Sequence, residues 1–234
     1  GLLGVNVPER YGGAEAGVVA YSLAITELAK ACASTTVAVA VSNMVAEVIA
    51  AFGDEAQCER YVPMITSGAA VAGAFALSEP MCGSDPGSLS TRARRTDDGW
   101  VLDGNKQWIT SGDHAGVFVV WARSNDAPGV KGISAFLVDK DTPGLLVGRH
   151  EDKMGLRGSS TVPLTFEECR IPADALLSAD GAGFRIAMVA LDGGRIGVAS
   201  QALGIGLAAL REALAYAKER KTFGQAIVQH QAVK

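Results

Sequence analysis

The stretch Asp97-Asp-Gly-Trp-Val-Leu-Asp-Gly-Asn-Lys-Gln-Trp-Ile-Thr110 decides the fold class of this 234-residue chain. Two turn-forming segments, 97–99 and 103–105, enclose a short β-prone run. No helical segment separates this run from the next ones, and the strand–helix alternation of a doubly wound sheet is missing. The spacing therefore predicts an antiparallel sandwich or barrel. The β-prone runs are 100–102, 117–122, 133–138 and 161–166.

Helical patterns flank this β region on both sides. Apolar residues recur at three-to-four spacing between residues 15 and 67, and Asp54-Glu-Ala-Gln57 resembles a capping box at the start of a third helix. A second helical pattern runs from Gly183 to about Arg220. We therefore predict an α+β multi-domain chain, with a partial N-terminal helical domain, a middle β domain and the first part of a C-terminal helical bundle. The predicted boundaries are 1–72, 73–178 and 179–234.

Five glycines interrupt the last helical pattern, at positions 193, 194, 197, 204 and 206. Each glycine costs roughly 0.8–1 kcal/mol relative to alanine inside a helix. Close approach of another helix or of a ligand would offset this cost. Both ends of the chain, including the helix-like 231–234, lie inside structured patterns, so we expect it to be part of a longer polypeptide.

The composition excludes several classes of function. The net charge is −4, from 21 basic and 25 acidic residues, and the mean hydropathy is +0.20. Nothing therefore predicts a nucleic-acid partner. We found no signal peptide and no apolar run near 18 residues, so we expect an intracellular protein with no membrane partner. Metal-ligand spacing and a disulfide framework are also missing. The cysteines and histidines are Cys32, Cys58, Cys82, Cys169, His114, His150 and His230.

Two motifs carry the chemistry of the chain. Leu77-Ser-Glu-Pro-Met-Cys-Gly-Ser-Asp85 is a turn-forming stretch that offers the short hydroxyls of Ser78 and Ser84. In Gly104-Asn-Lys-Gln-Trp-Ile-Thr110, Trp108 and Thr110 are two residues apart and would share one face of an extended chain. A flat aromatic beside a hydrogen-bond donor is typical of a site for a flat heterocycle. Taken alone, each motif is better explained by two loops and a core tryptophan, and only the two together favour a binding site.

Six blocks, in order along the whole chain, resemble the acyl-CoA dehydrogenase family. The segment 191–204 is most similar to the short-chain, or butyryl-CoA, branch. The resemblance implies an enzyme that uses FAD to convert acyl-CoA thioesters to trans-2-enoyl-CoA. The blocks are Val7-Pro-Glu-Arg-Tyr-Gly-Gly13, Ala76-Leu-Ser-Glu-Pro80 with Gly83-Ser-Asp85, Lys106-Gln-Trp-Ile-Thr110, Lys153-Met-Gly-Leu-Arg-Gly-Ser-Ser160, Leu191-Asp-Gly-Gly-Arg195, and Glu219-Arg-Lys-Thr-Phe-Gly224 with Gln229-His-Gln231.

The resemblance also implies a cofactor site. Trp108 would pack on the isoalloxazine ring and Thr110 would hydrogen-bond near flavin N5, the atom that accepts hydride. Ser84 would approach both the FAD phosphates and the CoA chain. The implied FAD-binding residues are Phe75, Leu77, Ser78, Gly83, Ser84, Trp108, Ile109 and Thr110 in one group, and Arg220, Phe223 and Gln231, which would reach the FAD of a neighbouring subunit.

The same family implies the substrate contacts and the assembly. Ser84 and the helical residues Asp192, Gly193, Gly194 and Arg195 would contact the thioester and pantetheine part of CoA. A FAD site shared between subunits implies a homo-oligomer, and a tetramer is expected. Simpler interpretations remain open: Asp192 pairing only with Arg195, Arg220 as a helix-end cation, and Phe223 as a core residue.

The general base of the family is a glutamate. One branch carries it where this chain has Gly194, and another carries it further towards the C-terminus. We therefore predict no catalytic base in this chain and expect the glutamate beyond Lys234. Electrons would pass to an electron-transfer flavoprotein in the cytoplasm, or in the mitochondrial matrix of a eukaryote. The alternatives are an acyl-CoA oxidase that uses O₂ and a non-catalytic flavoprotein on the same scaffold.

Overall fold

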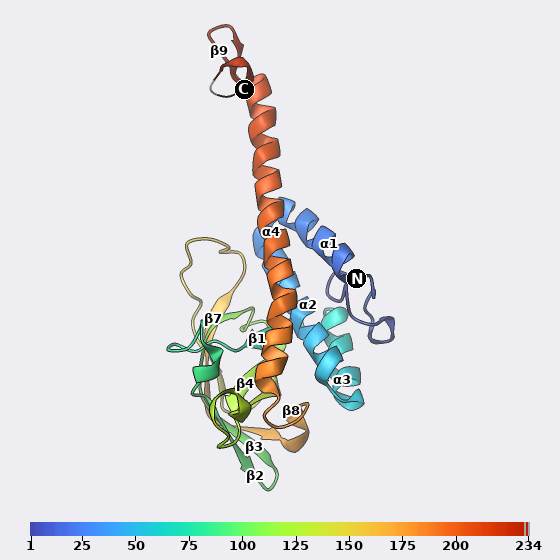
Figure 1. The fold of residues 1–234 in the computed structure, drawn as a ribbon, viewed down its shortest axis with the longest axis vertical. Helices are drawn as coiled ribbons and strands as arrows, with labels where there is room; N and C mark the ends of the chain where they lie inside the picture. The colour runs from blue at the N-terminus through green and yellow to red at the C-terminus, as the bar shows by residue number, and fades with distance from the viewer. Residues whose placement is uncertain (232, 234) are drawn as a thin grey trace.

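A computed structural model describes residues 1–231 and 233 of the chain. The predicted order of helical, β and helical segments is confirmed (Figure 1). The predicted helix end at 231–234 lies partly outside the described residues, and Gln231 itself is in a turn. The main helices are α1 (Gly17–Ala31), α2 (Ala33–Phe52), α3 (Glu55–Thr66) and α4 (Gly183–Glu219).

The β region forms one sheet with the strand order β6-β7-β3-β2-β4-β5-β8. Neighbouring strands are antiparallel, apart from a single parallel residue pair between β2 and β4. β1 pairs with β4 in parallel, which the sequence pattern did not predict. The strands are β1 (Ala72–Ala76), β2 (Arg92–Thr96), β3 (Gly99–Thr110), β4 (Ala115–Arg123), β5 (Ile133–Asp139), β6 (Leu145–Val147), β7 (Thr161–Pro172) and β8 (Leu176–Leu177).

Two cores lie on opposite faces of β4. Phe118 and Val120 pack with Phe136 and Leu164 inside the curved sheet. The alternate residues of β4 pack against α2, α3 and the start of α4. Every residue from Val117 to Ala122 is fully buried, as expected for a strand covered on both faces.

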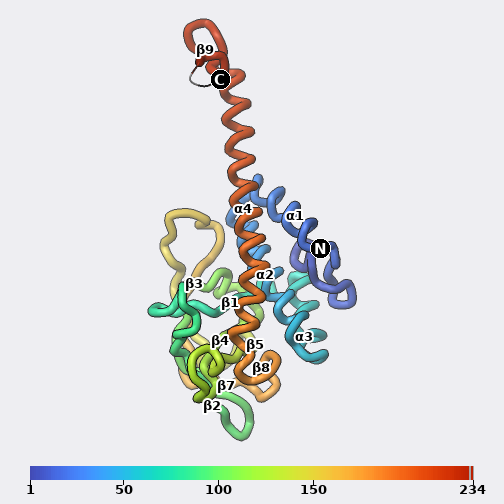
Figure 2. Tube along the Cα trace, viewed as in Figure 1, coloured from blue at the N-terminus to red at the C-terminus, as the bar shows by residue number. Residues whose placement is uncertain are grey.

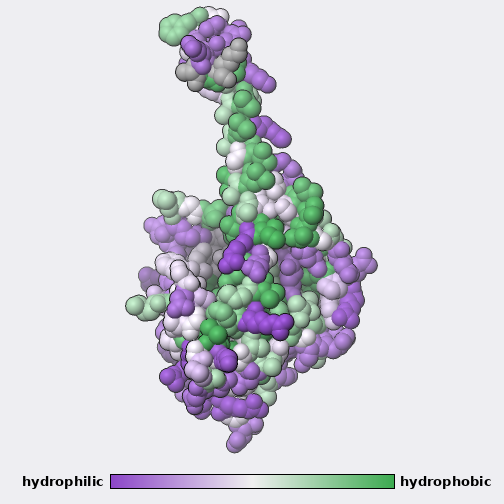
Figure 3. All heavy atoms as spheres, viewed as in Figure 1, coloured by the Kyte–Doolittle hydropathy of each residue, from purple (hydrophilic) through white to green (hydrophobic). Residues whose placement is uncertain are grey.

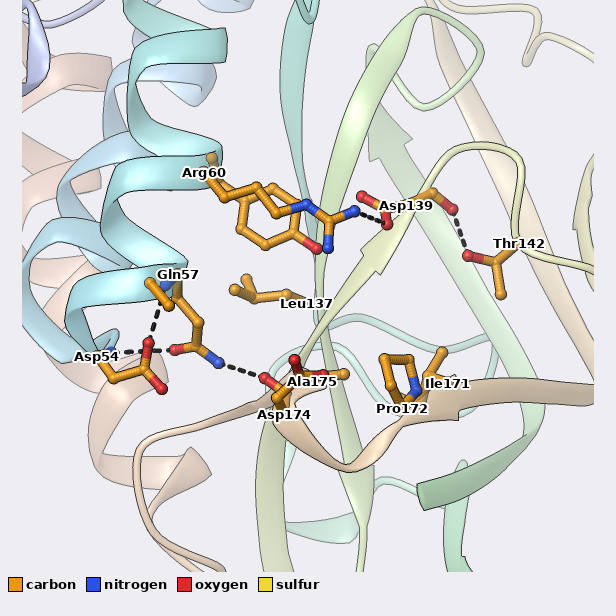
Figure 4. A pocket seen from close by; sticks show the side chains of 12 residues that line it. Asp54, Gln57, Arg60, Leu137, Asp139, Thr142, Ile171, Pro172, Asp174 and Ala175 are labelled. Atoms are coloured by element: carbon orange, nitrogen blue, oxygen red, sulfur yellow. Dashed lines mark hydrogen bonds and ion pairs between the residues drawn. The ribbon is translucent and has the colours of Figure 1, made fainter. Parts of the chain in front are cut away.

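The helix α3 fastens the helical region to the sheet. Its N-terminus carries the predicted capping box: Asp54 Oδ1 accepts from Gln57 N at 2.8 Å, and Gln57 Oε1 accepts from Asp54 N at 3.1 Å. The Gln57 amide also donates to the carbonyls of Asp174 and Leu176. Together with the Arg60–Asp139 ion pair, these bonds surround a cavity of about 90 Å³ (Figure 4). These bonds connect α3 to the sheet, and the small cavity between them is part of this structural contact.

The helix α4 runs from the sheet past α1 and α2 towards the C-terminal end of the described chain. At its start, Trp121 Nε1 donates to the carbonyl of Gly183 at 2.7 Å, which anchors the helix to β4. Its first half packs against α1, α2 and β5, whereas its outer half extends away from the body (Figure 2). β9 (Lys221–Thr222) and β10 (Gln225–Ala226) form a small hairpin at the far end.

The outer half of α4 carries an exposed apolar stripe (Figure 3). Its members are Leu203, Leu207, Leu210 and Leu214, which recur at three-to-four spacing, whereas the exposed Ile205 lies on the opposite side of the helix. The expectation that no apolar run approaches 18 residues is wrong, because α2 and α4 would qualify as membrane spans by length and composition alone, with mean hydropathies of 1.7 and 1.2. In α2 this apolarity serves the core, because Val45, Val48 and Ile49 are buried against the sheet and α3.

Two of the five helical glycines stand at close contacts, as predicted. A Cβ on Gly204 would lie 2.3 Å from the carbonyl oxygen of Thr26, and a Cβ on Gly197 would lie 2.6 Å from the Tyr21 hydroxyl. α1 and α4 can therefore cross closely, and the hydroxyls of Ser22 and Ser200 hydrogen-bond there at 2.7 Å. Gly206 has nothing within 4 Å of its Cβ position, so the structure gives no packing reason for it.

We expect the two neighbouring glycines to respond oppositely to alanine. Gly204→Ala is expected to destabilise the chain by about 1–3 kcal/mol, because the new methyl forces α1 off α4. Gly206→Ala is expected to stabilise it by up to about 1 kcal/mol through helix propensity alone. Thermal unfolding of the two variants checks this, and equal effects would show that the crossing is looser than described.

Candidate functional site

A cavity of about 590 Å³ lies where the two sequence motifs meet α2 and α4. The first motif follows β1 and the second ends β3, and these two strands are in contact. Helix residues close the opposite wall with mostly apolar side chains. The lining consists of Phe75, Leu77, Ser78, Gly83, Ser84, Asp85, Pro86, Gln107, Trp108, Ile109, Thr110, Val41, Met44, Phe184, Met188, Leu191 and Arg195. All eight predicted residues of the first cofactor group therefore line one cavity.

Trp108 is presented to this cavity by a bulge in β3. The pairing of β3 with β7 shifts register between Lys106 and Ile109, and Trp108 takes a φ of +62°. Such a φ is a genuine outlier for a bulky residue and stores backbone strain. The side chain remains 60% exposed although it lines the cavity. The alternative of a core tryptophan is therefore wrong for Trp108.

The donor set of the cavity fits a flat heterocycle such as a flavin. The exposed plane of Trp108 is flanked by the partly buried hydroxyl residues Ser78 and Thr110. Ser78 is itself held, because its carbonyl accepts from Gln107 N at 2.9 Å. Ser84 and Gly83 are exposed on the loop at the same cavity, and no atom lies within 4 Å of the Cβ position of Gly83. A large group can therefore approach the backbone closely at this point.

A second, almost entirely apolar cavity of about 500 Å³ adjoins the first between α1, α2 and α4. Both cavities are lined by Val41, Met44, Leu191 and Arg195, so they lie next to each other at these side chains. Gly194 faces the second cavity, and a Cβ there would lie 3.0 Å from Met44 Sδ. A side chain at position 194 would therefore crowd Met44, which lines the same cavity.

The other predicted substrate residues lie beside the cavities. Arg195 lines both cavities and pairs with Asp192 at 2.7 Å, with both side chains more than 70% exposed. The interpretation that Asp192 serves only this pair therefore stays open. Gly193 lies near Glu47, whose Oε2 would be 3.9 Å from a Cβ on the glycine.

The second cofactor group lies apart from the cavity. Arg220, Phe223 and Gln231 are at the far end of α4, around the β9–β10 hairpin (Figure 1). All three are exposed, and Phe223 is 98% exposed with a φ of +50°. A core role for Phe223 is thus excluded within this chain. These residues do not join the cavity of their own chain.

A buried ion pair that the sequence motifs did not predict lies beside the cavity-lining residues. Lys106 Nζ lies 2.8 Å from Glu79 Oε1, and the two side chains are 0% and 3% exposed. Ser90 N, Ser90 Oγ and Thr91 N also donate to the Glu79 carboxylate. Glu79 lies in the first motif and Lys106 in the second. Their opposite charges in two neighbouring motifs are the only sequence signal for this ion pair.

The surroundings of this pair shift the pKa of both groups. Burial alone would raise the pKa of Glu79, but the Lys106 charge and the hydrogen bonds from Lys106, Thr91 and Ser90 outweigh it and lower the pKa to about 2. Burial lowers the pKa of Lys106, and Glu79 opposes this shift. Glu79 is therefore ionised throughout the physiological range.

This shift predicts an acid-sensitive contribution to stability. Because the pKa of Glu79 is lower in the folded state, its contribution is complete above about pH 4.5 and is lost as the pH falls towards 2. The loss is expected to be about 3 kcal/mol. Denaturant unfolding measured between about pH 5 and 2 should show a steeper loss of unfolding free energy in the wild type than in a Lys106→Met/Glu79→Gln variant. Parallel curves would contradict the ionised pair.

Within the described part of the chain, no group of three or more His, Cys, Asp or Glu residues could hold a metal ion. Asp85 is the carboxylate among the residues that line the larger cavity, and it is exposed on the loop.

Three family models match consecutive parts of the chain. They describe the acyl-CoA dehydrogenase N-terminal domain at residues 1–69, the middle domain at 74–169 and the C-terminal domain at 181–234. The mitochondrial short-chain specific acyl-CoA dehydrogenase of Homo sapiens is 50% identical over all 234 residues. The chain spans 57% of the length of this relative.

Solved structures agree with the family models. A chain from a structural study of the electron transferring flavoprotein of Acidaminococcus fermentans matches with a TM-score of 0.97 and 44% identity, covering all of this chain and 61% of the matched chain. Butyryl-CoA dehydrogenase from Megasphaera elsdenii matches with a TM-score of 0.95 and 41% identity, covering all of this chain and 62% of the matched chain. A glutaryl-CoA dehydrogenase from Mycobacterium smegmatis in complex with FADH2 matches with a TM-score of 0.92 and 34% identity, covering all of this chain and 58% of the matched chain. The chain belongs to the acyl-CoA dehydrogenase family.

Proposed function

We propose that the protein catalyses the FAD-dependent α,β-dehydrogenation of short-chain acyl-CoA thioesters to trans-2-enoyl-CoA. The observation that carries this proposal is the convergence of both motifs on one cavity, with the strained and exposed Trp108 in its wall. The family is one of FAD flavoproteins, and the short-chain relative and the butyryl-CoA dehydrogenase structure favour a short acyl chain.

The residues of this chain would bind and orient both reactants. Trp108 offers a flat surface for the ring, and the Thr110 hydroxyl stands two residues away as a donor. FAD, when bound, supplies the acceptor for the hydride that leaves the β-carbon. A donor near the developing negative charge stabilises it, so Thr110 assists the reaction as well as binding.

The apolar walls would hold the acyl group and exclude water. Val41, Met44 and Leu191 border both cavities, and the acyl chain would extend along them from the flavin side towards Gly194. Ser84, Asp192, Gly193 and Arg195 would contact the CoA part of the substrate. Removal of the α-proton requires a base, which we assign to a glutamate C-terminal to Lys234. Gly194 cannot serve, because it has no side chain.

The cofactor site would be completed by a second subunit. Arg220, Phe223 and Gln231 lie exposed at the end of α4, beyond an apolar stripe, and would reach the FAD of a neighbouring chain in a homotetramer. The match to a chain from a structural study of an electron transferring flavoprotein supports such a flavoprotein as the electron acceptor. We place the reaction in the cytoplasm, or in the mitochondrial matrix of a eukaryote.

Flavin bleaching in the full-length protein tests the proposed activity. Butyryl-CoA, octanoyl-CoA and a branched acyl-CoA are added without oxygen to the FAD-loaded protein, and the flavin absorption band is followed. We expect butyryl-CoA to bleach it fastest. A yellow protein that none of the three bleaches would refute the acyl-CoA substrate. Rapid reoxidation by O₂ in stopped flow would instead identify an acyl-CoA oxidase.

A further inference from the structure

The buried Lys106–Glu79 pair connects the two motifs that form the flavin cavity. Neither side chain lines the cavity, but the adjacent residues Ser78 and Gln107 do, and so does Trp108 two residues after Lys106. Besides its 2.8 Å contact with Glu79, Lys106 Nζ donates to the carbonyl oxygen of Leu77 at 3.1 Å. The ammonium group therefore ties the end of the first strand to the bulged part of β3.

The contact with Leu77 acts on the peptide group that precedes Ser78. The Leu77 carbonyl and the Ser78 N–H belong to one planar, conjugated unit and point in opposite directions in a trans peptide. All peptide bonds in the described part of the chain are trans. An ammonium on the oxygen polarises this unit and makes the Ser78 N–H a stronger donor on the side away from Lys106. Ser78 lines the cavity.

Stability alone is a poor explanation for this pair. Buried ion pairs can often be replaced by apolar side chains of similar volume with a neutral or stabilising result. Glu79 already accepts three hydrogen bonds from Ser90 and Thr91, so its carboxylate is fixed independently of Lys106. It can therefore hold the ammonium in one place, against Leu77.

We propose that Lys106, held by Glu79, is a positioning residue of the flavin site, which orients and polarises the Leu77–Ser78 peptide towards the pyrimidine edge of the flavin. The inference rests on the proposed function. Reduction places negative charge on the ring, and hydrogen bonds and charges near its nitrogens tune its electronics. The pair should therefore favour reduced over oxidised flavin.

The test compares the Lys106→Met/Glu79→Gln variant with wild type in the full-length, FAD-loaded protein. Removing both charges together leaves no unpaired buried charge, so the variant is expected to fold. We expect the preference for reduced flavin to fall about tenfold, which lowers the two-electron potential by about 30 mV. The affinity for oxidised FAD should change less than threefold.

A matched control removes the exposed Arg60–Asp139 pair by Arg60→Gln/Asp139→Asn, and its potential should stay that of wild type. A folded Lys106→Met/Glu79→Gln variant with an unchanged potential would overturn the inference. If this variant fails to fold, Lys106→Gln/Glu79→Gln keeps a neutral donor towards Leu77, and the same potential shift is required of it. Wild-type protein that binds no FAD would contradict the proposed function instead.

Discussion

Replacing Lys106 alone by methionine is expected to lower the free energy of unfolding by about 3–5 kcal/mol. The reason is the partner that remains. Glu79 is 3% exposed, and without the ammonium its carboxylate is a buried charge with no countercharge within ion-pair distance in the described structure. Hydrogen bonds from Ser90 and Thr91 reduce this cost but carry no positive charge. Urea unfolding at neutral pH measures the difference.

Two comparisons separate the buried charge from the loss of a long side chain. Adding Glu79→Gln to Lys106→Met should recover most of the lost stability, because the amide leaves no charge in the core. Arg60→Met removes a basic residue from an exposed pair and should cost less than about 1 kcal/mol. If the double variant were as unstable as Lys106→Met, packing rather than charge would explain the effect.

Local patterns predicted the helical parts well. The capping box at Asp54 and Gln57 depends on residues three apart, and α4 follows its pattern from Gly183 to the end of the helix. The glycines were only partly understood. Close approach explains Gly204 and Gly197, whose Cβ positions are filled by α1, but it does not explain Gly206. Which glycine meets a neighbour depends on the crossing of two helices far apart in sequence.

In the second motif, the alternation of side chains expected for a β-strand does not predict which residues are buried. Strict alternation would place Lys106, Trp108 and Thr110 on one face of β3. Lys106 is instead fully buried and Trp108 largely exposed, because the register shift lies between Lys106 and Ile109. That bulge forms where β3 meets both β7 and Ser78, so it is a tertiary feature. The parallel pairing of β1 with β4 is equally non-local.

The sequence predicted residues that line the cavity, but not its shape or its helical wall. The eight residues that the resemblance named all line this cavity, whereas no motif pointed to Val41 and Met44 from α2. From sequence alone, apolar residues on a helix are assigned to the hydrophobic core, because only the fold shows that they face a cavity. The second cofactor group, Arg220, Phe223 and Gln231, remains a prediction about a neighbouring subunit.

Trp108→Gly is expected to change stability and flavin binding in opposite directions. The φ of +62° strains a bulky residue by about 1–3 kcal/mol, whereas glycine adopts it freely. Because the side chain is 60% exposed, its removal forfeits little burial. The flavin-free protein should therefore be as stable as wild type, or up to about 1 kcal/mol more stable.

The same substitution removes the plane on which the flavin is proposed to pack. Losing that buried aromatic surface should weaken FAD binding by about 10- to 100-fold. Trp108→Phe keeps a plane and should bind with intermediate affinity. Fluorescence titration with FAD and thermal unfolding of the FAD-free proteins provide the two measurements. Strain is retained in a wild-type fold only where the surroundings impose it, and here it presents an aromatic face to the cavity. A Trp108→Gly protein that is less stable yet binds FAD normally would show that Trp108 serves packing instead.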